Sequence, residues 1–386
     1  MYELRDYQVS GVTVALDHLL NGSHRDIPVV VAPTGAGKSL YVAKIASTLE
    51  KDVLVFQPSI ELLEQNYGKF LDYGGKGTIF SASAGQKNIG EVTFATIGSV
   101  KDIPEQFSHI RYVVIDECHL VSPKDGGMYM KFFDGLPKVK IIGLTATAFR
   151  NKRYSFGYSY TQLNLLPRER PRFFNDIIHV TQIKELYDKG FLCPVKYIAL
   201  SWDKGVLKVN STGGEYTDES IKEALDIQQI NQRLPDIIKQ SIEKGRKSRL
   251  VFVHSVDDAE RLARIVPQSS FVSAKTKKSE RKEIIAKFKR GEITTLFNVS
   301  TLTTGFDYPP LDTIIIARPT MSLALYMQMV GRGIRVSEGK EYCALVDMCG
   351  NIDMFGKLEE ITYSKNAKGM WVLKSGNKLL SGVPLN

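Results

Sequence analysis

The first 145 residues alternate between short apolar runs and segments with helical spacing. The apolar runs are rich in β-branched residues and end in polar turns, which is typical of buried strands. They cover residues 27–31, 53–56, 91–95, 111–115 and 141–144. Residues 9–20, 40–49 and 61–70 repeat apolar side chains every three or four positions, which predicts helices. The alternation predicts a mostly parallel, doubly wound sheet flanked by helices.

The second half of the chain repeats this alternation with less regularity. Strand patterns cover residues 249–255, 271–273, 294–299, 313–316 and 342–346. Helical patterns cover residues 219–242, 257–266 and 279–289, and another begins at Ser322. Pro235 is a candidate break in the first of these helices. We therefore predict a second α/β domain.

Residues 149–174 have a different composition, because arginine and lysine alternate there with tyrosine and phenylalanine. Cationic side chains bind backbone phosphates and aromatic rings stack on bases, so Arg153 and Tyr158 are candidate nucleic-acid contacts. A solvated connector that packs some rings onto a domain is an equal alternative. We expect a first domain over residues 1–150, a basic and aromatic connector over 151–195, and a second domain over 196–386.

Composition narrows the class of protein. The 386 residues carry 43% hydrophobic side chains and a net charge of +9, so two cores and a polyanionic partner are both plausible. Many proteins with such a charge bind no polyanion. The four cysteines are scattered without a C-x-x-C pair, which argues against zinc and disulfides and fits a reducing compartment. The chain has no signal-like start and no apolar run of the ~20 residues that span a bilayer. We expect a cytoplasmic protein of a bacterial or phage-infected cell, not a secreted or membrane protein.

A glycine-rich turn follows the first predicted strand. It reads Ala32, Pro33, Thr34, Gly35, Ala36, Gly37, Lys38 and Ser39. Gly35 and Gly37 let backbone N–H groups point inward, and the helix that begins after them presents its positive end. Lys38 would reach the phosphates of a nucleotide and Ser39 would ligate Mg²⁺. Ala32 departs from the strict pattern, which begins with glycine, and a plain strand-to-helix turn is the alternative.

Polar residues also follow the predicted strands 111–115 and 141–144. Asp116 and Glu117 are suited to hold Mg²⁺ and to orient an attacking water, respectively. His119, Thr145 and Thr147 are candidates for coupling that site to its surroundings. An acidic turn without chemistry is the alternative for Asp116 and Glu117.

Further candidates lie before and between these motifs. Gln8, beside Arg5, carries an amide that can pair with an adenine edge, although a solvated glutamine is the alternative. Three hydroxyl residues after predicted strands could contact nucleic-acid phosphates: Ser59, Thr96 and Ser99. Helix N-capping is at least as good an explanation for each hydroxyl.

The second half contributes an arginine pair and a polar turn. Arg332 and Arg335 are three residues apart, so both can face one phosphate site in a planar fork. Gly305 permits a tight turn, and Asp307 could contact a ribose or an arginine. His254 and Thr301 are candidate nucleic-acid contacts, and Gln328 is a candidate coupling residue.

Together these motifs resemble a superfamily 2 helicase of the DExH-box type over nearly the whole chain. The resemblance rests on five segments: residues 4–8, 32–39, 116–119, 145–147 and 328–335. It implies two tandem RecA-like domains with ATP and Mg²⁺ in the interdomain cleft. It assigns Gln8 to adenine, residues 33–39 to the nucleotide and its Mg²⁺, and residues 145–147 to coupling. It also assigns Asp116 to the metal, Glu117 to the water, and Arg332 and Arg335 as arginine fingers. The segment 345–356 is similar to RadD-like and phage DNA repair helicases, and the segments 4–8 and 116–119 resemble both these and UvsW-like branch-migration enzymes.

The motifs therefore predict an ATP-driven helicase or translocase that unwinds or branch-migrates DNA in repair, recombination or replication. Its expected partners are single-stranded, forked or branched DNA. An RNA helicase is an alternative, because no residue reads a 2′-hydroxyl unambiguously. A motor subunit of a larger assembly, without unwinding of its own, is another.

Overall fold

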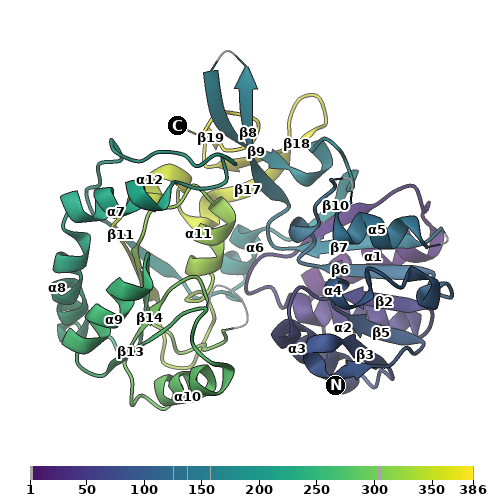
Figure 1. Ribbon diagram of the computed structural model, residues 1–386, viewed down its shortest axis with the longest axis horizontal. Helices are drawn as coiled ribbons and strands as arrows, with labels where there is room; N and C mark the ends of the chain where they lie inside the picture. Colours follow the sequence, from purple (N-terminus) through teal and green to yellow (C-terminus); the bar gives the residue numbers. More distant parts are fainter. Residues whose placement is uncertain (1–2, 125, 137, 157, 302–305, 386) are drawn as a thin grey trace. The chain divides into compact units, whose positions relative to one another are not determined.

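The computed structural model describes residues 3–385 except 125, 137, 157 and 302–305, and the chain divides into two compact units. The first unit comprises residues 1–150, 164–182 and 365–371. The second comprises residues 151–163, 183–364 and 372–386. Each unit is built around its own sheet (Figure 1).

The first unit contains an eight-stranded sheet with the order β10-β1-β7-β6-β2-β5-β3-β4. Neighbouring strands pair in parallel, except that β3 and β4 are antiparallel. The strands are β1 (Pro28–Val31), β2 (Val53–Phe56), β3 (Thr78–Ser81), β4 (Gln86–Lys87), β5 (Val92–Ala95), β6 (Tyr112–Asp116), β7 (Lys140–Thr145) and β10 (Asp176–Val180). The carboxyl ends of β1, β6 and β7 are neighbours, which brings their following loops to one edge.

The helices of the first unit cover the sheet with their apolar faces. They are α1 (Asp6–Asn21), α2 (Lys38–Leu49), α3 (Ile60–Asp72), α4 (Ile97–Val100) and α5 (Met128–Asp134), with short 3₁₀ turns at 82–84, 104–107, 118–120 and 166–168. Phe56 at the end of β2 packs edge-on against Phe132 of α5, with ring centroids 5.5 Å apart. Both rings are fully buried, and each such burial contributes about 1.5–3 kcal/mol. The strands β1, β2 and β5 are buried along their whole length.

The second unit contains a six-stranded, all-parallel sheet with the order β11-β16-β15-β12-β14-β13. Its strands are β11 (Val195–Ala199), β12 (Arg249–Val253), β13 (Ser269–Val272), β14 (Thr295–Asn298), β15 (Thr313–Ala317) and β16 (Cys343–Asp347). Its helices are α6 (Ile183–Asp188), α7 (Asp218–Ile227), α8 (Ile230–Glu243), α9 (Val256–Ile265), α10 (Lys278–Lys289), α11 (Leu323–Val330) and α12 (Asn351–Phe355), with a 3₁₀ turn at 358–360. The predicted helix over 219–242 is interrupted at Gln229, which has a left-handed φ of 52°, and not at Pro235, which lies inside α8.

The segment predicted as a connector, 151–195, contains regular structure and is shared between the two units. A hairpin is formed by β8 (Phe149–Phe156) and β9 (Tyr158–Leu165), and β10 joins the first sheet beside β1. The hairpin was not anticipated because its side chains are mostly polar and aromatic. β10 was missed because it is a short strand with Asp176 and His179 among its five residues. A small C-terminal sheet contains β17 (Ile361–Lys365), β18 (Trp371–Ser375) and β19 (Lys378–Leu379).

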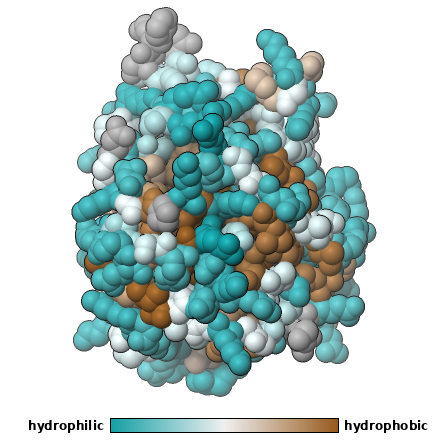
Figure 2. Space-filling view, turned by 90° about the vertical axis from the view of Figure 1, so that its right-hand side faces the viewer, coloured by the Kyte–Doolittle hydropathy of each residue, from teal (hydrophilic) through white to brown (hydrophobic). Residues whose placement is uncertain are grey.

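Other features concern the surface and the cysteines. The face shown in Figure 2 carries separate hydrophobic areas among hydrophilic side chains. Within the described ranges, no helix is both long enough and apolar enough to traverse a bilayer. All four cysteines are free and buried, and the described residues contain no group of side chains that could hold a metal in the manner of a zinc site.

Candidate nucleotide and nucleic-acid site

The glycine-rich turn between β1 and α2 forms a compact loop that ends at the start of a helix. Gly35 and Gly37 have φ values of 89° and 74°, a region that favours glycine. The loop is closed by a bond from Ala36 N to Pro33 O of 3.0 Å. α2 begins at Lys38, so its first N–H groups and the positive end of its dipole face the loop. This is the local geometry of an anion site.

Lys38 lies between the two carboxylates that follow β6. Its Nζ is 2.7 Å from Glu117 Oε1 and also bonds Asp116 Oδ1. Burial alone would lower the pKa of Lys38, but Asp116 and Glu117 outweigh it and raise that pKa. Burial likewise opposes ionisation of Glu117, but Lys38 and His119 hold its pKa well below the usual range. The three side chains therefore form a cluster in which Lys38 meets two carboxylates, with Asp116 buried and Lys38 and Glu117 slightly exposed.

Asp116 is fixed by partners that sequence reasoning missed. Asn66 Nδ2 of α3 donates to Asp116 Oδ2 at 2.9 Å and to Gln57 Oε1 at 2.8 Å, and Glu117 N donates to Asp116 Oδ1 at 2.8 Å. Asn66 and Gln57 are both buried. The signal that could have found them is a polar residue on the apolar face of a predicted helix, which requires a buried partner.

A second series of contacts runs from Glu117 to β7. Glu117 has a left-handed φ of 47°, and its Oε2 is 3.3 Å from His119 Nδ1. The same His119 nitrogen is 2.8 Å from Thr145 Oγ1, which also accepts a bond from Thr147 N at 3.0 Å. Thr147 Oγ1 is buried and has no hydrogen-bond partner among the described residues. The structure thus brings together the predicted water-orienting residue and the three predicted coupling residues His119, Thr145 and Thr147.

Gln8 is held against the glycine-rich loop. Its Nε2 donates to Ala36 O at 2.9 Å, and its Oε1 accepts from Arg5 N at 2.9 Å. Tyr7, which was not anticipated, donates its hydroxyl to the same carbonyl at 3.2 Å. Both amide atoms of Gln8 are therefore already engaged, so the reading of adenine by Arg5 and Gln8 stays a prediction.

The residues present fit a nucleotide with a divalent cation. Carboxylates are the ligands that Mg²⁺ prefers, and Asp116 and Glu117 place two of them beside a helix N-terminus. Ser39 lies in the first turn of that helix and is partly exposed, as is Thr34 in the loop. The bound metal would supply charge neutralisation for the phosphates. Asp116 and Ser39 would hold it.

The three predicted phosphate-binding hydroxyls of the first unit have internal partners. Ser59 caps α3 by accepting from Leu62 N at 3.4 Å, which is the alternative that sequence reasoning left open. Thr96 and Ser99 lie 2.9 Å apart through their hydroxyls, and Ser99 Oγ accepts from Ala82 N. Their contact with nucleic acid stays a prediction.

The arginine pair of the second unit is anchored to two consecutive residues, Phe306 and Asp307. Arg332 Nη1 donates to Phe306 O at 2.7 Å, and Arg335 Nη1 is 2.9 Å from Asp307 Oδ1. Gly305 lies outside the described residues. Gln328 is a partly buried residue of α11. The sequence left a ribose or an arginine as the partner of Asp307, and in the structure that partner is Arg335.

His254 and Thr301 lie at the carboxyl ends of neighbouring strands. His254 Nε2 is 3.6 Å from Asp218 Oδ1, and burial together with Arg318 lowers the pKa of His254. Thr301 Oγ1 donates to Val299 O at 2.9 Å. Arg318, which was not anticipated, donates to Ser300 Oγ at 3.2 Å from the end of β15.

The hairpin β8–β9 carries the predicted basic and aromatic contacts. Arg153 is exposed and donates to Asn210 O at 2.9 Å. Tyr154 and Tyr160 stack across the hairpin with ring centroids 5.5 Å apart. The side chain of Tyr158 lies outside the described residues.

Comparison with known proteins decides the family. Residues 1–150 match the family described as "Type III restriction enzyme, res subunit", and residues 229–337 match the "Helicase conserved C-terminal domain". These two domains are those of a superfamily 2 helicase, in agreement with the DExH-box type. The chain carries a domain of the restriction-enzyme res-subunit family followed by a conserved C-terminal helicase domain.

Individual relatives of this helicase chain agree with the family. It is 25% identical to the putative ATP-dependent helicase Irc3 of Saccharomyces cerevisiae, over 90% of this chain and 51% of the relative. It is also 25% identical to the DNA 3'-5' translocase XPB2 of Sulfurisphaera tokodaii, over 86% of this chain and 79% of the relative. The solved DNA-bound structure of the ATP-dependent Type ISP restriction-modification enzyme LlaBIII superposes with a TM-score of 0.64 at 16% identity, covering 90% of this chain and 28% of that one.

The architecture follows from these comparisons. Solved neighbours of this chain are two-domain RecA-like helicases, and its two sheets, one mostly and one entirely parallel, have that fold. The chain spans about half the length of its yeast relative and less than two thirds of a Lactococcus phage relative.

Proposed function

We propose that the chain is an ATP-dependent DNA translocase that unwinds or branch-migrates DNA structures. The observation that carries this proposal is the continuous series of contacts from Lys38 through Glu117 and His119 to Thr145. Such a series links a nucleotide site to a second strand end, which is what a motor needs to convert hydrolysis into movement. The relative named as a DNA 3'-5' translocase and the DNA-bound neighbour support DNA as the substrate.

Each group of the site has a distinct task in this proposal. The loop and Lys38 bind phosphates, and Asp116, fixed by Asn66, presents a carboxylate to the cation. Glu117 orients the attacking water. Arg332 and Arg335 would act on the same nucleotide from the second unit. An arginine in this role is typically worth about 10³–10⁵ in rate.

DNA binding would rest on phosphate contacts more than on base contacts. The net charge of +9 favours a polyanion. The hairpin β8–β9 presents Arg153 and the stacked pair Tyr154 and Tyr160, a combination suited to a backbone and its bases. Binding should therefore tolerate many sequences and weaken steeply with salt.

The experiment is an ATPase and strand-displacement panel with single-stranded DNA, forks, four-way junctions and RNA duplexes. We expect Lys38→Ala and Glu117→Gln to abolish DNA-stimulated hydrolysis, while Glu117→Gln keeps ATP binding. Lys44→Ala is a matched control, because Lys44 lies on the same helix but next to Tyr73, away from the carboxylates. Normal turnover by Lys38→Ala or Glu117→Gln would refute the site, and stimulation by RNA alone would favour an RNA helicase.

A motor subunit without unwinding of its own is the second candidate. It is favoured by the restriction-subunit family that matches residues 1–150 and by the restriction-modification neighbour. Displacement of a triplex-forming oligonucleotide without separation of duplex strands would identify such a translocase.

A further inference from the structure

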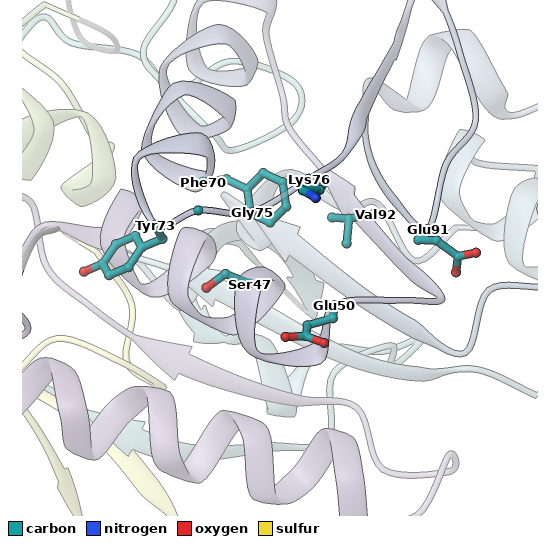
Figure 3. A pocket seen from close by; sticks show the side chains of 9 residues that line it. Ser47, Glu50, Phe70, Tyr73, Gly75, Lys76, Glu91 and Val92 are labelled. Carbon is teal, nitrogen blue, oxygen red and sulfur yellow. The ribbon is translucent and has the colours of Figure 1, made fainter.

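Three pockets of similar size lie among the described residues and differ in their charged linings. Each has a volume of about 480 Å³. The pocket of the first unit in Figure 3 combines Glu50 and Glu91 with Lys76 beside the ring of Phe70. A second pocket, at the amino ends of the second sheet, mixes four Lys and Arg residues with Asp312, Glu338 and Glu341. The third, which we call the β11 pocket, has cationic side chains and no carboxylate in its lining.

The β11 pocket lies between one helix and the edge of the second sheet. Its floor is apolar and is formed by Ile198 of β11 with Ala344 and Val346 of β16. Its wall is one face of α8 and the residue that follows it. The residues of that wall, spaced i, i+3, i+4 and i+7, are Ile237, Gln240, Ser241 and Lys244. Ile198 is 42% exposed, so an apolar floor is left open to solvent.

The rim of the pocket is positive. Lys196, Lys244 and Arg246 line it together with Tyr342. Lys196 Nζ and the Arg246 guanidinium lie 3.7 and 3.9 Å from the centroid of the Tyr342 ring. The ring therefore holds two cations at one place. The lining of the β11 pocket itself contains no carboxylate, whereas Asp312, Glu338 and Glu341 line the adjoining pocket, which shares Lys244, Arg246 and Tyr342. This combination complements an occupant that is apolar in one part and anionic in another.

β11 also offers backbone groups for pairing. It is the edge strand of the second sheet, with β16 as its neighbour. Cys343 N donates to Pro194 O, and Leu200 N donates to Asp347 O, so the even-numbered residues of this segment face β16. The N–H and C=O groups of Val195, Tyr197 and Ala199 consequently point to the open edge. An open edge is a template for an extended chain.

We propose that the β11 pocket binds an extended acidic peptide of a partner protein, added to the sheet as a strand beside β11. An apolar side chain of the peptide enters the pocket over Ile198, and its carboxylates meet Lys196, Lys244 and Arg246. Main-chain bonds to the strand edge give affinity, and the pocket gives specificity. We favour a peptide over a small ligand because the pocket borders an edge strand, and only an extended chain can fill the pocket and pair with that strand at once.

The proposed site is separate from the nucleotide and nucleic-acid residues of the same unit. Its lining residues Arg246, Thr313 and Tyr342 lie at or before the amino ends of β12, β15 and β16. His254, Thr301 and Arg318 lie at the carboxyl ends of β12, β14 and β15. The peptide site therefore does not depend on the proposed function.

The test is fluorescence anisotropy with a labelled ten-residue peptide of alternating valine and glutamate. We expect the protein to bind it, and the double variant Lys196→Glu with Lys244→Glu to bind at least about tenfold more weakly. Ile198→Asp, at an exposed position, should weaken binding as well. Lys239→Glu is the matched control, because Lys239 is an exposed residue of α8 outside the pocket and should leave the affinity unchanged. Thermal unfolding checks that each variant is folded, and DNA-stimulated ATPase should not change.

Four results would overturn the proposal. They are no binding of the peptide, equal binding by the double variant, an equal loss with Lys239→Glu, and equal binding of a peptide with proline at alternate positions. The last would show that strand pairing is not used, because proline lacks the N–H that pairs. A labelled single-stranded oligonucleotide is run in parallel. Loss of its binding, but not of peptide binding, in the double variant would assign the rim to nucleic acid instead.

Discussion

The close approach of Gln8 to Gly37 makes a quantitative prediction for Gly37→Ala. A Cβ at position 37 would lie 2.7 Å from Gln8 Nε2, and residue 37 has a φ of 74°. The left-handed backbone costs a non-glycine residue about 1 kcal/mol. Displacing Gln8 breaks its bonds to Ala36 O and Arg5 N, which contribute about 1 kcal/mol each when buried. We expect Gly37→Ala to lower the free energy of unfolding by about 2–3 kcal/mol.

Two other glycines of the same unit separate the cost of the left-handed backbone from the cost of displacing Gln8. Gly74 has a φ of 78° and open space where an alanine methyl group would lie, so Gly74→Ala should cost only the backbone strain of about 1 kcal/mol. Gly68 lies inside α3 with no neighbour within 4 Å of its Cβ position, so Gly68→Ala should stabilise the helix by about 0.5–1 kcal/mol.

Urea denaturation followed by circular dichroism measures all three variants on one scale. A loss in Gly37→Ala no larger than in Gly74→Ala would refute the argument that Gln8 is rigidly held. The same variant tests the nucleotide role of Gln8. If Gln8 reads adenine, Gly37→Ala should raise the KM for ATP more than the KM for GTP. An equal change in both would leave Gln8 as a purely structural residue of the loop.

Three further predictions concern the hydroxyls of β7 and its loop, the partly buried histidine of α1, and the hairpin. Thr145→Val removes the partner of His119 and of Thr147 N and should lower the free energy of unfolding by about 1–2 kcal/mol, whereas Thr147→Val removes a hydroxyl with no partner among the described residues and should not lower it. Equal losses of unfolding free energy in the two variants would contradict these contacts. Burial, opposed by the bond to Ile141 O, lowers the pKa of His18, so the unfolded chain takes up the proton at a higher pH than the folded chain. The contribution of His18 to stability is therefore fully present above about pH 6.5 and falls at lower pH, and His18→Gln should flatten that decline in pH-dependent denaturation. Tyr160→Ala together with Tyr158→Ala should reduce fork remodelling more than single-strand-stimulated ATPase, and equal losses of the two activities would reject a junction role for the hairpin.

The sequence predicts the glycine-rich loop and the start of α2 because their geometry is local. A β-branched run, two glycines and a helix start determine the loop at residues 32–39, since glycine alone adopts the two left-handed positions freely. Asp116, Glu117 and Thr145 come together because the carboxyl ends of neighbouring parallel strands share one edge.

The parts that were missed depend on long-range choices. Asn66 bonds Asp116 across fifty residues of chain, and no local pattern names that partner. β10 joins the first sheet only after the chain has formed the hairpin β8–β9. Its five residues include polar side chains, so its sequence resembles that of a connector. Ser59 is a local feature that the sequence leaves ambiguous. A hydroxyl after a strand fits a helix cap and a phosphate contact equally well, and the structure shows the cap.

The order of the chain through the two units has a practical consequence for dissecting this helicase. A chain truncated at residue 150, where the first family match ends, would lack β10. β1, which is buried along its whole length, would then become the edge of its sheet, with Val29 and Val31 presenting the backbone groups that face β10 in the full chain. Such a fragment should aggregate when expressed alone. A soluble first unit would need residues 164–182 restored, for example by replacing residues 151–163 with a short glycine-rich linker.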